Sequence, residues 1–394
     1  MKRKPYAKLK ELIEGSIENG YSPKPVNKET GRWVLGLGAL TPKGLNLSEK
    51  KSIALDDTKF PNRLLNEGDF LVSRSNTREK VGQASLYKGG LSNCIYPDLM
   101  MRFRINKSLA TIDYIDHYLR SPIAQNYFAS RAAGSNLSMV KITKSILAEL
   151  LIYNPSLQEQ KAIAAILSAW DEAIEKTERL IRLKKFSFQE LLSSRIFRQS
   201  FKTQKLGKTI QEISQRNQTG ISRVLSVTNH SGFVLPENQF ERRVASQNLE
   251  NYKVICKGQY AYNPSRINVG SIARLDQWDI GILSPMYVVF EIDETAIHSD
   301  FLYYWLQTKE ARKRICASTQ GSVRESVSFN DFANLIVPLP ELKIQQEIIY
   351  ELSLIEAELN NLSKIKEKLL LQKQGLMQKL LTGKWRVNFK EEKQ

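Results

Sequence analysis

The sequence predicts an α+β protein in which two tandemly repeated globular α/β domains are joined by two long helices forming an antiparallel coiled coil. Two observations predict this fold class: a pair of heptad patterns, and a similar order of short segments before each of them. The expected globular domains are residues 1–153 and 202–338. The expected long helices are residues 154–201 and residues 339–394, the latter including the C-terminal tail.

The first heptad pattern runs from about residue 156 to residue 195. Apolar residues recur there at alternating intervals of four and three, and charged residues fill the positions between them, as in a coiled coil. The apolar seam comprises Ile163, Leu167, Trp170, Ile174, Ile181 and Phe188. A long helix with one narrow apolar stripe needs a partner.

The second heptad pattern repeats the first one 185 residues further along the chain. Its seam comprises Ile348, Leu352, Ile355, Leu359, Leu362 and Leu369. Each helix follows a proline, Pro155 or Pro340, which fits a helix entry. Agreement of both frame and entry favours an intramolecular antiparallel pair over two unrelated amphipathic helices on separate cores.

Polar residues interrupt both seams. They are Thr177, Lys184, Lys366 and Lys373. Such residues are costly in a buried seam and can fix its register, but long side chains can also reach an exposed edge.

The composition indicates a polyanionic partner. A chain of 394 residues suggests two or three domains, and its net charge of +17 points to nucleic acid. A membrane surface is the rival partner, but the long helices carry acids as well as bases, unlike a basic interfacial helix. No apolar run reaches the length of about 18 residues that a membrane span needs, and no export signal stands at the N-terminus. The three dispersed cysteines, Cys94, Cys256 and Cys316, are expected to be reduced thiols in a cytosolic protein.

In chain order, the first half is expected to begin with a short helix over residues 7–18, followed by loops and short strands over residues 20–44. Alternation around Phe70 and Val72 predicts a half-buried strand. A helix is expected over residues 112–132, then a Gly-led loop over residues 134–143 and a strand-like segment over residues 147–155.

The second half repeats this order. The Val81-Gly82 dipeptide recurs as Val269-Gly270, and residues 299–317, 321–329 and 332–340 match the helix, the Gly-led loop and the strand. The chain is therefore one unit of about half its length written twice. The segments before Arg63 and before Lys253 have little in common. Two binding modules with different targets would look like this, although drift without consequence gives the same pattern.

Catalytic motifs are missing from the sequence. It has no phosphate-binding GxxxxGK[ST] loop, and the glycines of residues 36–41 match a dinucleotide fingerprint only in part, so they indicate a turn. Residues 262–265 also read as a turn rather than a base-gripping motif. His117, His230 and His298 are too dispersed to form a metal site with the cysteines. These observations favour a binding protein.

Basic and amide side chains gather on corresponding loops of the two halves. Arg can read guanine and Asn can read adenine in the major groove, whereas Lys mainly holds phosphate. Any one of these residues is ordinarily a solvated surface side chain, but as a set they indicate DNA contacts. The predicted set is Arg74, Asn76, Arg78, Lys80, Asn136 and Lys141 in the first half, and Arg266, Asn268, Arg274 and Arg324 in the second.

The whole layout resembles the specificity (S) subunit of type I restriction-modification systems. Residues 336–348 and 375–387 carry the resemblance, with the first-half copy at residues 152–163. It implies two target-recognition domains, each reading one half of a bipartite double-stranded DNA target. It also implies that the paired helices set the gap between the half-sites and dock two methyltransferase (M) subunits, which restriction (R) subunits join.

The resemblance further implies a subunit without catalytic residues or metal of its own. S-adenosylmethionine, ATP and magnesium are then expected on the partner subunits. Two alternatives stay open: a cytosolic coiled-coil scaffold whose globular halves bind protein, and a methyltransferase or nuclease whose motif has diverged.

Overall fold

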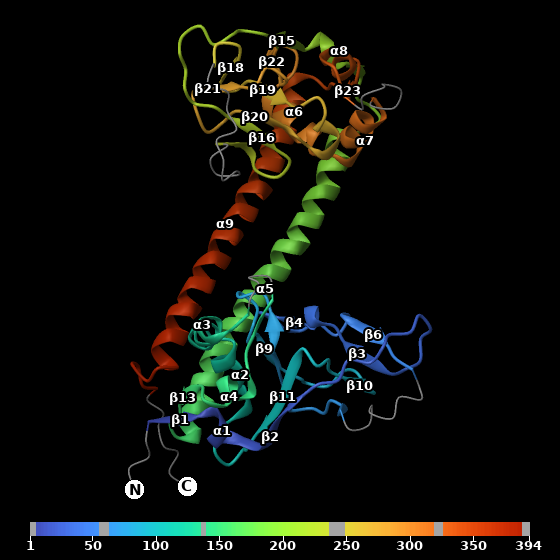
Figure 1. Ribbon diagram of the computed structural model, residues 1–394. Coiled ribbons are helices and arrows are strands. Elements are labelled where there is room, and N and C mark those ends of the chain that lie inside the picture. The colour runs from blue at the N-terminus through green and yellow to red at the C-terminus, as the bar shows by residue number, and fades with distance from the viewer. Residues whose placement is uncertain (1–4, 55–62, 135–138, 236–248, 319–325, 388–394) are drawn as a thin grey trace. The chain divides into compact units, whose positions relative to one another are not determined.

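The computed structural model describes residues 5–54, 63–134, 139–235, 249–318 and 326–387. The chain divides into two compact units: residues 1–178 with 364–394, and residues 179–363. Each unit contains a globular part and one half of each long helix (Figure 1). The α+β class and the two long helices agree with the prediction from sequence.

Each unit is built around a four-stranded antiparallel sheet with the same strand order. In the first unit the order is β2 (Ile13–Asn19), β11 (Met100–Ile105), β7 (Phe70–Ser73) and β9 (Ala84–Leu86). In the second it is β15 (Ile210–Ile213), β22 (Val288–Ile292), β19 (Tyr260–Tyr262) and β20 (Ile272–Arg274). The repeat therefore includes β2 and β15, which lie where the two halves share little sequence.

The prediction of a helix over residues 7–18 is wrong. Only α1 (Leu9–Leu12) is helical, between β1 (Tyr6–Lys8) and β2. The spacing of Ile13 and Ile17 fits a helix, but both side chains pack on the core from β2, and Gly15 has a φ of +77°, outside the helical region. Pairing of β2 with the distant β11 decides the local structure.

The prediction of one helix over residues 112–132 is also wrong, because the segment forms two helices. They are α2 (Ile112–Leu119) and α3 (Pro122–Arg131). Ser121 caps α3 by accepting the N–H of Ala124 at 3.4 Å, and Pro122 occupies the first turn, where its missing N–H costs nothing. The second unit has the same break, between α6 (Ser299–Leu306) and α7 (Lys309–Ser318), so the predicted match between these segments is confirmed.

Strand β7 is buried on both faces rather than half-buried as predicted. Phe70 and Val72 join the main core of the unit, whereas Leu71 joins a smaller apolar cluster with Leu35 and Tyr96. An inserted sheet belongs to this side of the unit: β10 (Cys94–Ile95), β3 (Trp33–Leu35) and β6 (Lys50–Ser52). The alternation in the sequence reported one buried face and missed the other.

The remaining elements of the globular parts are short. In the first unit they are η1 (Leu37–Ala39), β4 (Leu40–Thr41), β5 (Gly44–Leu45), β8 (Ser75–Asn76), β12 (Val140–Lys141), α4 (Lys144–Ala148) and β13 (Leu151–Tyr153). In the second they are β14 (Thr203–Lys205), η3 (Leu206–Lys208), β16 (Ser226–Thr228), β17 (Gly232–Val234), β18 (Lys253–Cys256), η5 (Ile267–Val269), β21 (Ile280–Leu283), α8 (Phe329–Ala333) and β23 (Ile336–Pro338). The strand expected over residues 147–155 is thus confined to β13.

The long helices are α5 (Leu157–Ile196) and α9 (Leu342–Leu380), and every predicted seam residue on them is buried or half-buried. In the second unit, Lys184 pairs with Glu358 and Arg195 with Glu351, each at 2.7 Å. Higher numbers on α5 face lower numbers on α9, so the helices are antiparallel. Toward the ends of the seams, residues such as Ile163 belong to the core of a globular part.

A buried glutamine ties the start of each long helix to the domain before it. Gln160 accepts the N–H of Thr111, and Gln345 accepts the N–H of His298, both at 2.8 Å. Each glutamine also donates to the carbonyl of the proline before its own helix, at 3.1 and 2.8 Å. Because Thr111 and His298 stand at the entries of α2 and α6, the glutamines satisfy buried backbone donors there.

Candidate nucleic-acid interface

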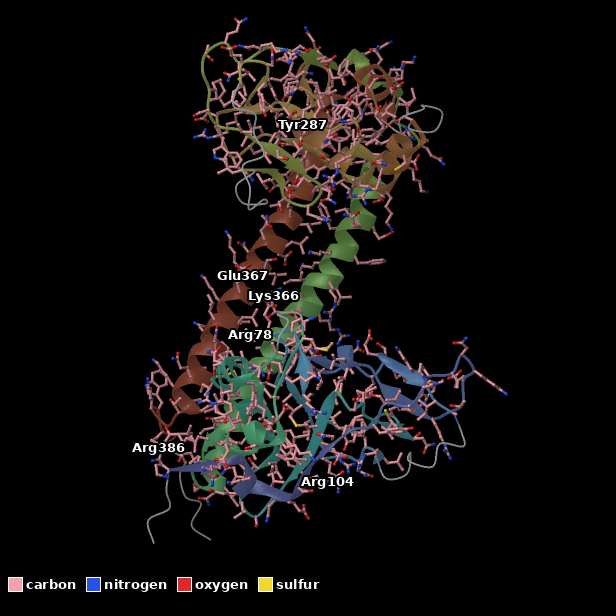
Figure 2. All side chains as sticks on the ribbon, in the orientation of Figure 1. Arg78, Arg104, Tyr287, Lys366, Glu367 and Arg386 are labelled. Carbon is pink, nitrogen blue, oxygen red and sulfur yellow. The ribbon has the colours of Figure 1, made fainter. Side chains whose placement is uncertain are left out.

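The first predicted contact set lies on the turn between β8 and β9, where Figure 2 labels Arg78. Arg78 and Lys80 are exposed, and Arg74 is half-buried, with its guanidinium 3.4 Å from the carbonyl oxygen of Asp98. The N–H of Lys80 donates to the carbonyl of Thr77 at 3.0 Å and closes the turn. A hydrogen-bonded turn therefore presents two cationic side chains to solvent.

The repeated Val-Gly dipeptide has a backbone explanation. Gly82 and Gly270 have φ values of +77° and +98°, in the region that favours glycine. A Cβ at Gly82 would also lie 2.4 Å from the ring of Phe128. The dipeptide thus marks a turn of fixed geometry directly after the basic residues.

The structure brings Lys141 to the same turn. β12 pairs with β8 so that Lys141 lies opposite Ser75 and Val140 lies opposite Asn76. The amide of Asn76 is partly used within the turn, because its Oδ1 accepts the N–H of Thr77 at 2.9 Å. Lys141 is exposed, so the Gly-led loop and the strand-turn contribute to one basic surface.

The second unit repeats this arrangement in part. Arg266 is exposed and Asn268 is half-buried, and the carbonyl of Asn268 accepts a hydrogen bond from the Cys316 thiol at 3.7 Å. The N–H of Val327 donates to the carbonyl of Pro264 at 3.1 Å, which joins this turn to the end of the Gly-led loop. The other predicted loop residues, Asn136, Ser322 and Arg324, lie outside the described residues.

Arg274 has a structural position rather than a free guanidinium. It pairs with Asp276 and Asp300, both at 2.7 Å, and lies over the ring of Tyr303 at 5.5 Å. Burial alone would lower the pKa of Arg274, but the hydrogen bonds with Asp276 and Asp300 raise it above its ordinary value. Because two carboxylates already neutralise it, Arg274 is poorly placed to contact a base.

A cleft of about 480 Å³ lies beside the turn of the first unit. Its wall includes Leu37, Thr41, Asn76, Lys80, Arg120 and Gln125. The size is within the usual range for ligand pockets, and amide groups lie next to apolar side chains in it. Sequence reasoning identified Asn76 and Lys80 but missed the others, because segments far apart in the chain supply them.

In the described parts of the chain, no group of three or more His, Cys, Asp or Glu side chains is placed to hold a metal ion. Nor does any helix there combine the length and apolar character needed to cross a bilayer.

Comparison with known proteins identifies the class to which this fold and these loops belong. Residues 8–185 and 257–371 match the family described as the type I restriction modification DNA specificity domain. Because the match covers more than half of the sequence, the chain belongs to this family.

Two curated relatives from Methanocaldococcus jannaschii extend over most of the chain. It is 24% identical to the putative type I restriction enzyme MjaX specificity subunit over 96% of its own length and 93% of the relative's. It is also 24% identical to the type I restriction enzyme MjaVIII specificity subunit, over 86% and 84% of the two lengths.

Two solved structures share the fold. One is a chain from a study of complex assembly and conformational transition in the type I R-M system, with a TM-score of 0.59, 16% identity, and coverage of 95% of this chain and 97% of that one. The other is the type I restriction-modification S subunit from M. genitalium, with a TM-score of 0.57, 16% identity, and coverage of 98% and 96%.

Proposed function

We propose that this chain is the DNA-recognition subunit of a type I restriction-modification complex, and that each of its two units reads one half of a bipartite double-stranded DNA target. One observation carries the proposal: both units place a turn with exposed basic residues between the same two strands of the same sheet. The inserts around the shared sheets differ, which suits two different half-sites.

The paired helices α5 and α9 set the gap between the half-sites and dock two methyltransferase subunits, which restriction subunits join. Support comes from large apolar side chains that stand in solvent on these helices. Leu183 and Phe186 on α5 are 56% and 68% exposed, and Tyr350 and Leu354 on α9 are 66% and 54% exposed. Apolar side chains left open in this number are typical of a protein-binding surface.

The chain itself is non-catalytic in this proposal and acts in the cytoplasm. S-adenosylmethionine, ATP and magnesium are bound by the methyltransferase and restriction subunits. Purified chain should therefore neither methylate nor cleave DNA when these cofactors are added without the partners. Activity of the chain alone would contradict this assignment.

The decisive experiment is a genome-wide map of N6-methyladenine in the source cells, with the gene for this chain intact and deleted. We expect methylation to disappear at one split motif, consisting of two short half-sites and a fixed gap. If the native cells show no such motif, the chain is co-expressed with its methyltransferase partner in a methylation-free host. An absence of split-motif methylation there as well contradicts the proposal.

Binding of the purified chain to duplex DNA separates this function from that of a protein-binding scaffold. Because phosphate contacts release counterions, the affinity should fall steeply with salt, with a log–log slope of about −0.9 per phosphate contact. A scaffold would bind its protein partner regardless of added duplex.

A further inference from the structure

Two acidic residues occupy equivalent positions on the long helices and face equivalent short helices. Asp171 lies on α5 in the first unit and Glu356 lies on α9 in the second, 185 residues apart, the same offset as the seams. Each accepts hydrogen bonds from the helix that leads its domain's helical pair, α2 or α6. Neither residue belongs to the apolar seam.

In the first unit, Asp171 joins α5 to both α2 and α9. Arg120 at the end of α2 donates to Asp171 at 3.0 Å, and Lys373 of α9 pairs with the same carboxylate. Nδ1 of the buried His117 lies 3.8 Å from it. Burial favours a higher pKa, but the hydrogen bond and charge of Lys373, with the charge of Arg120, hold the pKa of Asp171 below its usual value. The carboxylate is therefore ionised and fully engaged at neutral pH.

In the second unit, tyrosines replace the cations. The hydroxyls of Tyr304 and Tyr303 on α6 donate to Glu356 at 2.9 and 3.3 Å. Tyr304 is buried, and burial together with the charge of Glu356 raises the pKa of its hydroxyl above the usual value. The same joint is thus built twice with different side chains.

Both joints continue to the strand that follows the basic turn. In the first unit, Arg120 also contacts Asp116 at 3.3 Å, and Asp116 accepts the N–H of Leu86, the last residue of β9, at 3.3 Å. In the second, Tyr303 lies under Arg274, the last residue of β20, which also pairs with Asp300 of α6. A chain of directional contacts therefore links each long helix to the strand after its basic turn.

We propose that Asp171 and Glu356 are positioning residues that fix the rotation of each domain about the helix pair and thereby the length of the gap in the DNA target. The inference rests on the proposed function. Apolar packing has no strong directional preference, whereas a hydrogen bond to a charged group does. Without these carboxylates, the domains keep their cores and their reading turns but lose the directional contact that fixes their orientation.

The test uses the full chain co-expressed with its methyltransferase partner in a methylation-free host, followed by mapping of N6-methyladenine. The variants Asp171→Asn and Glu356→Gln remove the charge and keep the size of the side chain. We expect unchanged half-sites, with new methylation where the gap is one base pair longer or shorter. On synthetic duplexes, the preference for the native gap should fall by about tenfold, the effect of losing one hydrogen bond to a charged group.

The matched controls are the exposed acids Glu172→Gln and Glu347→Gln on the same helices, which should keep the native gap. Tyr304→Phe removes the donor to Glu356 from the other side and should relax the gap in the same direction. Thermal unfolding of each variant shows whether it is folded, so that a lost site is not confused with a lost preference.

A gap that stays strictly native in Asp171→Asn, Glu356→Gln and Tyr304→Phe, in the sites that remain methylated and in the duplex assay, overturns the inference while leaving the proposed function intact. A wild-type chain that directs methylation to no split motif overturns the proposed function itself.

Discussion

Buried polar side chains hold the globular parts on the long helices, and each does so through the group it satisfies. Gln160 and Gln345 fill the same position in the two units and accept the same kind of backbone donor. Glu159, which is 1% exposed, is instead paired bidentately with Arg386 of the C-terminal segment, both contacts at 2.7 Å (Figure 2). A buried polar group contributes to stability only while its partner is present.

Replacing Gln160 or Gln345 with Leu should lower the free energy of unfolding by about 2 kcal/mol, because a buried backbone N–H loses its acceptor. Urea unfolding followed by circular dichroism measures the loss. The neighbouring exposed glutamines supply matched controls, since Gln158→Leu and Gln346→Leu should change stability by less than about 0.5 kcal/mol. Equal losses in the buried and the exposed pairs would show that the hydrogen bonds are not responsible.

His117 should make the first unit sensitive to acid. Burial, followed by the charge of Arg120, lowers the pKa of His117 to about 4, from 6.5. The folded state favours neutral histidine, so this stability is complete above pH 6.5 and declines as the pH falls toward 4. The total loss is on the order of 3 kcal/mol.

The His117→Gln variant removes this titration. Urea unfolding at pH 7 and at pH 4.5 should therefore show a smaller loss of stability in the variant than in the native chain. The same loss in both would mean that carboxylates, rather than His117, account for the acid sensitivity.

At the scale of the element, the helix pair is stabilised by few buried residues. Ile174 and Ile181 on α5 are 7% and 9% exposed, although neither belongs to the core of a globular part. Leu180 and Leu183 on the same helix are 41% and 56% exposed. The middle of α5 therefore depends on a narrow seam, and its other apolar residues are open to a partner.

Truncating the seam should cost far more than truncating the open face. We expect Ile181→Ala to lower the free energy of unfolding by about 2 kcal/mol, because the change leaves a cavity between the helices. Leu183→Ala should cost less than about 0.5 kcal/mol in the isolated chain. The open-face change should instead weaken binding of the methyltransferase subunit, measured by titration calorimetry. Opposite results for the two variants would mean that the seam is assigned to the wrong face.

At the scale of the whole molecule, one domain plan is used twice and the long helices are shared between both copies. The sheets have the same strand order, and the contact division cuts α5 after Glu178 and α9 after Ser363. Each copy thus carries its own half of the helix pair. This organisation allows the reading loops to change without altering the element that sets the gap.

Inserting seven residues after Glu178 and seven after Ser363 should lengthen the unread gap and leave both half-sites unchanged. Seven residues complete about two helical turns and add about 10 Å, which corresponds to about three base pairs of duplex. Methylation mapping of cells that carry the doubly extended chain measures the gap. An insertion in only one helix should abolish methylation, because the seams no longer match. A changed half-site with the native gap would refute the role of the helices as a spacer.

The sequence by itself determined the features that depend on local periodicity and on internal repetition. Heptad spacing identified the long helices, and the constant offset of 185 residues identified two related units. Basic residues around the repeated Val-Gly dipeptide identified the turns, since a glycine with positive φ leaves a local mark in the sequence. The same offset also relates Gln160 to Gln345 and Asp171 to Glu356, although the roles of these residues were not apparent before their partners were known.

Only the tertiary structure decided the features that depend on a partner far along the chain. β2 is a strand because β11 pairs with it, and β7 is buried on both faces because an inserted segment covers the second one. Arg274 is neutralised by Asp300 of α6, which no spacing in the sequence predicts. Local patterns specify which side chains can be buried or charged, whereas the fold decides which group each one meets.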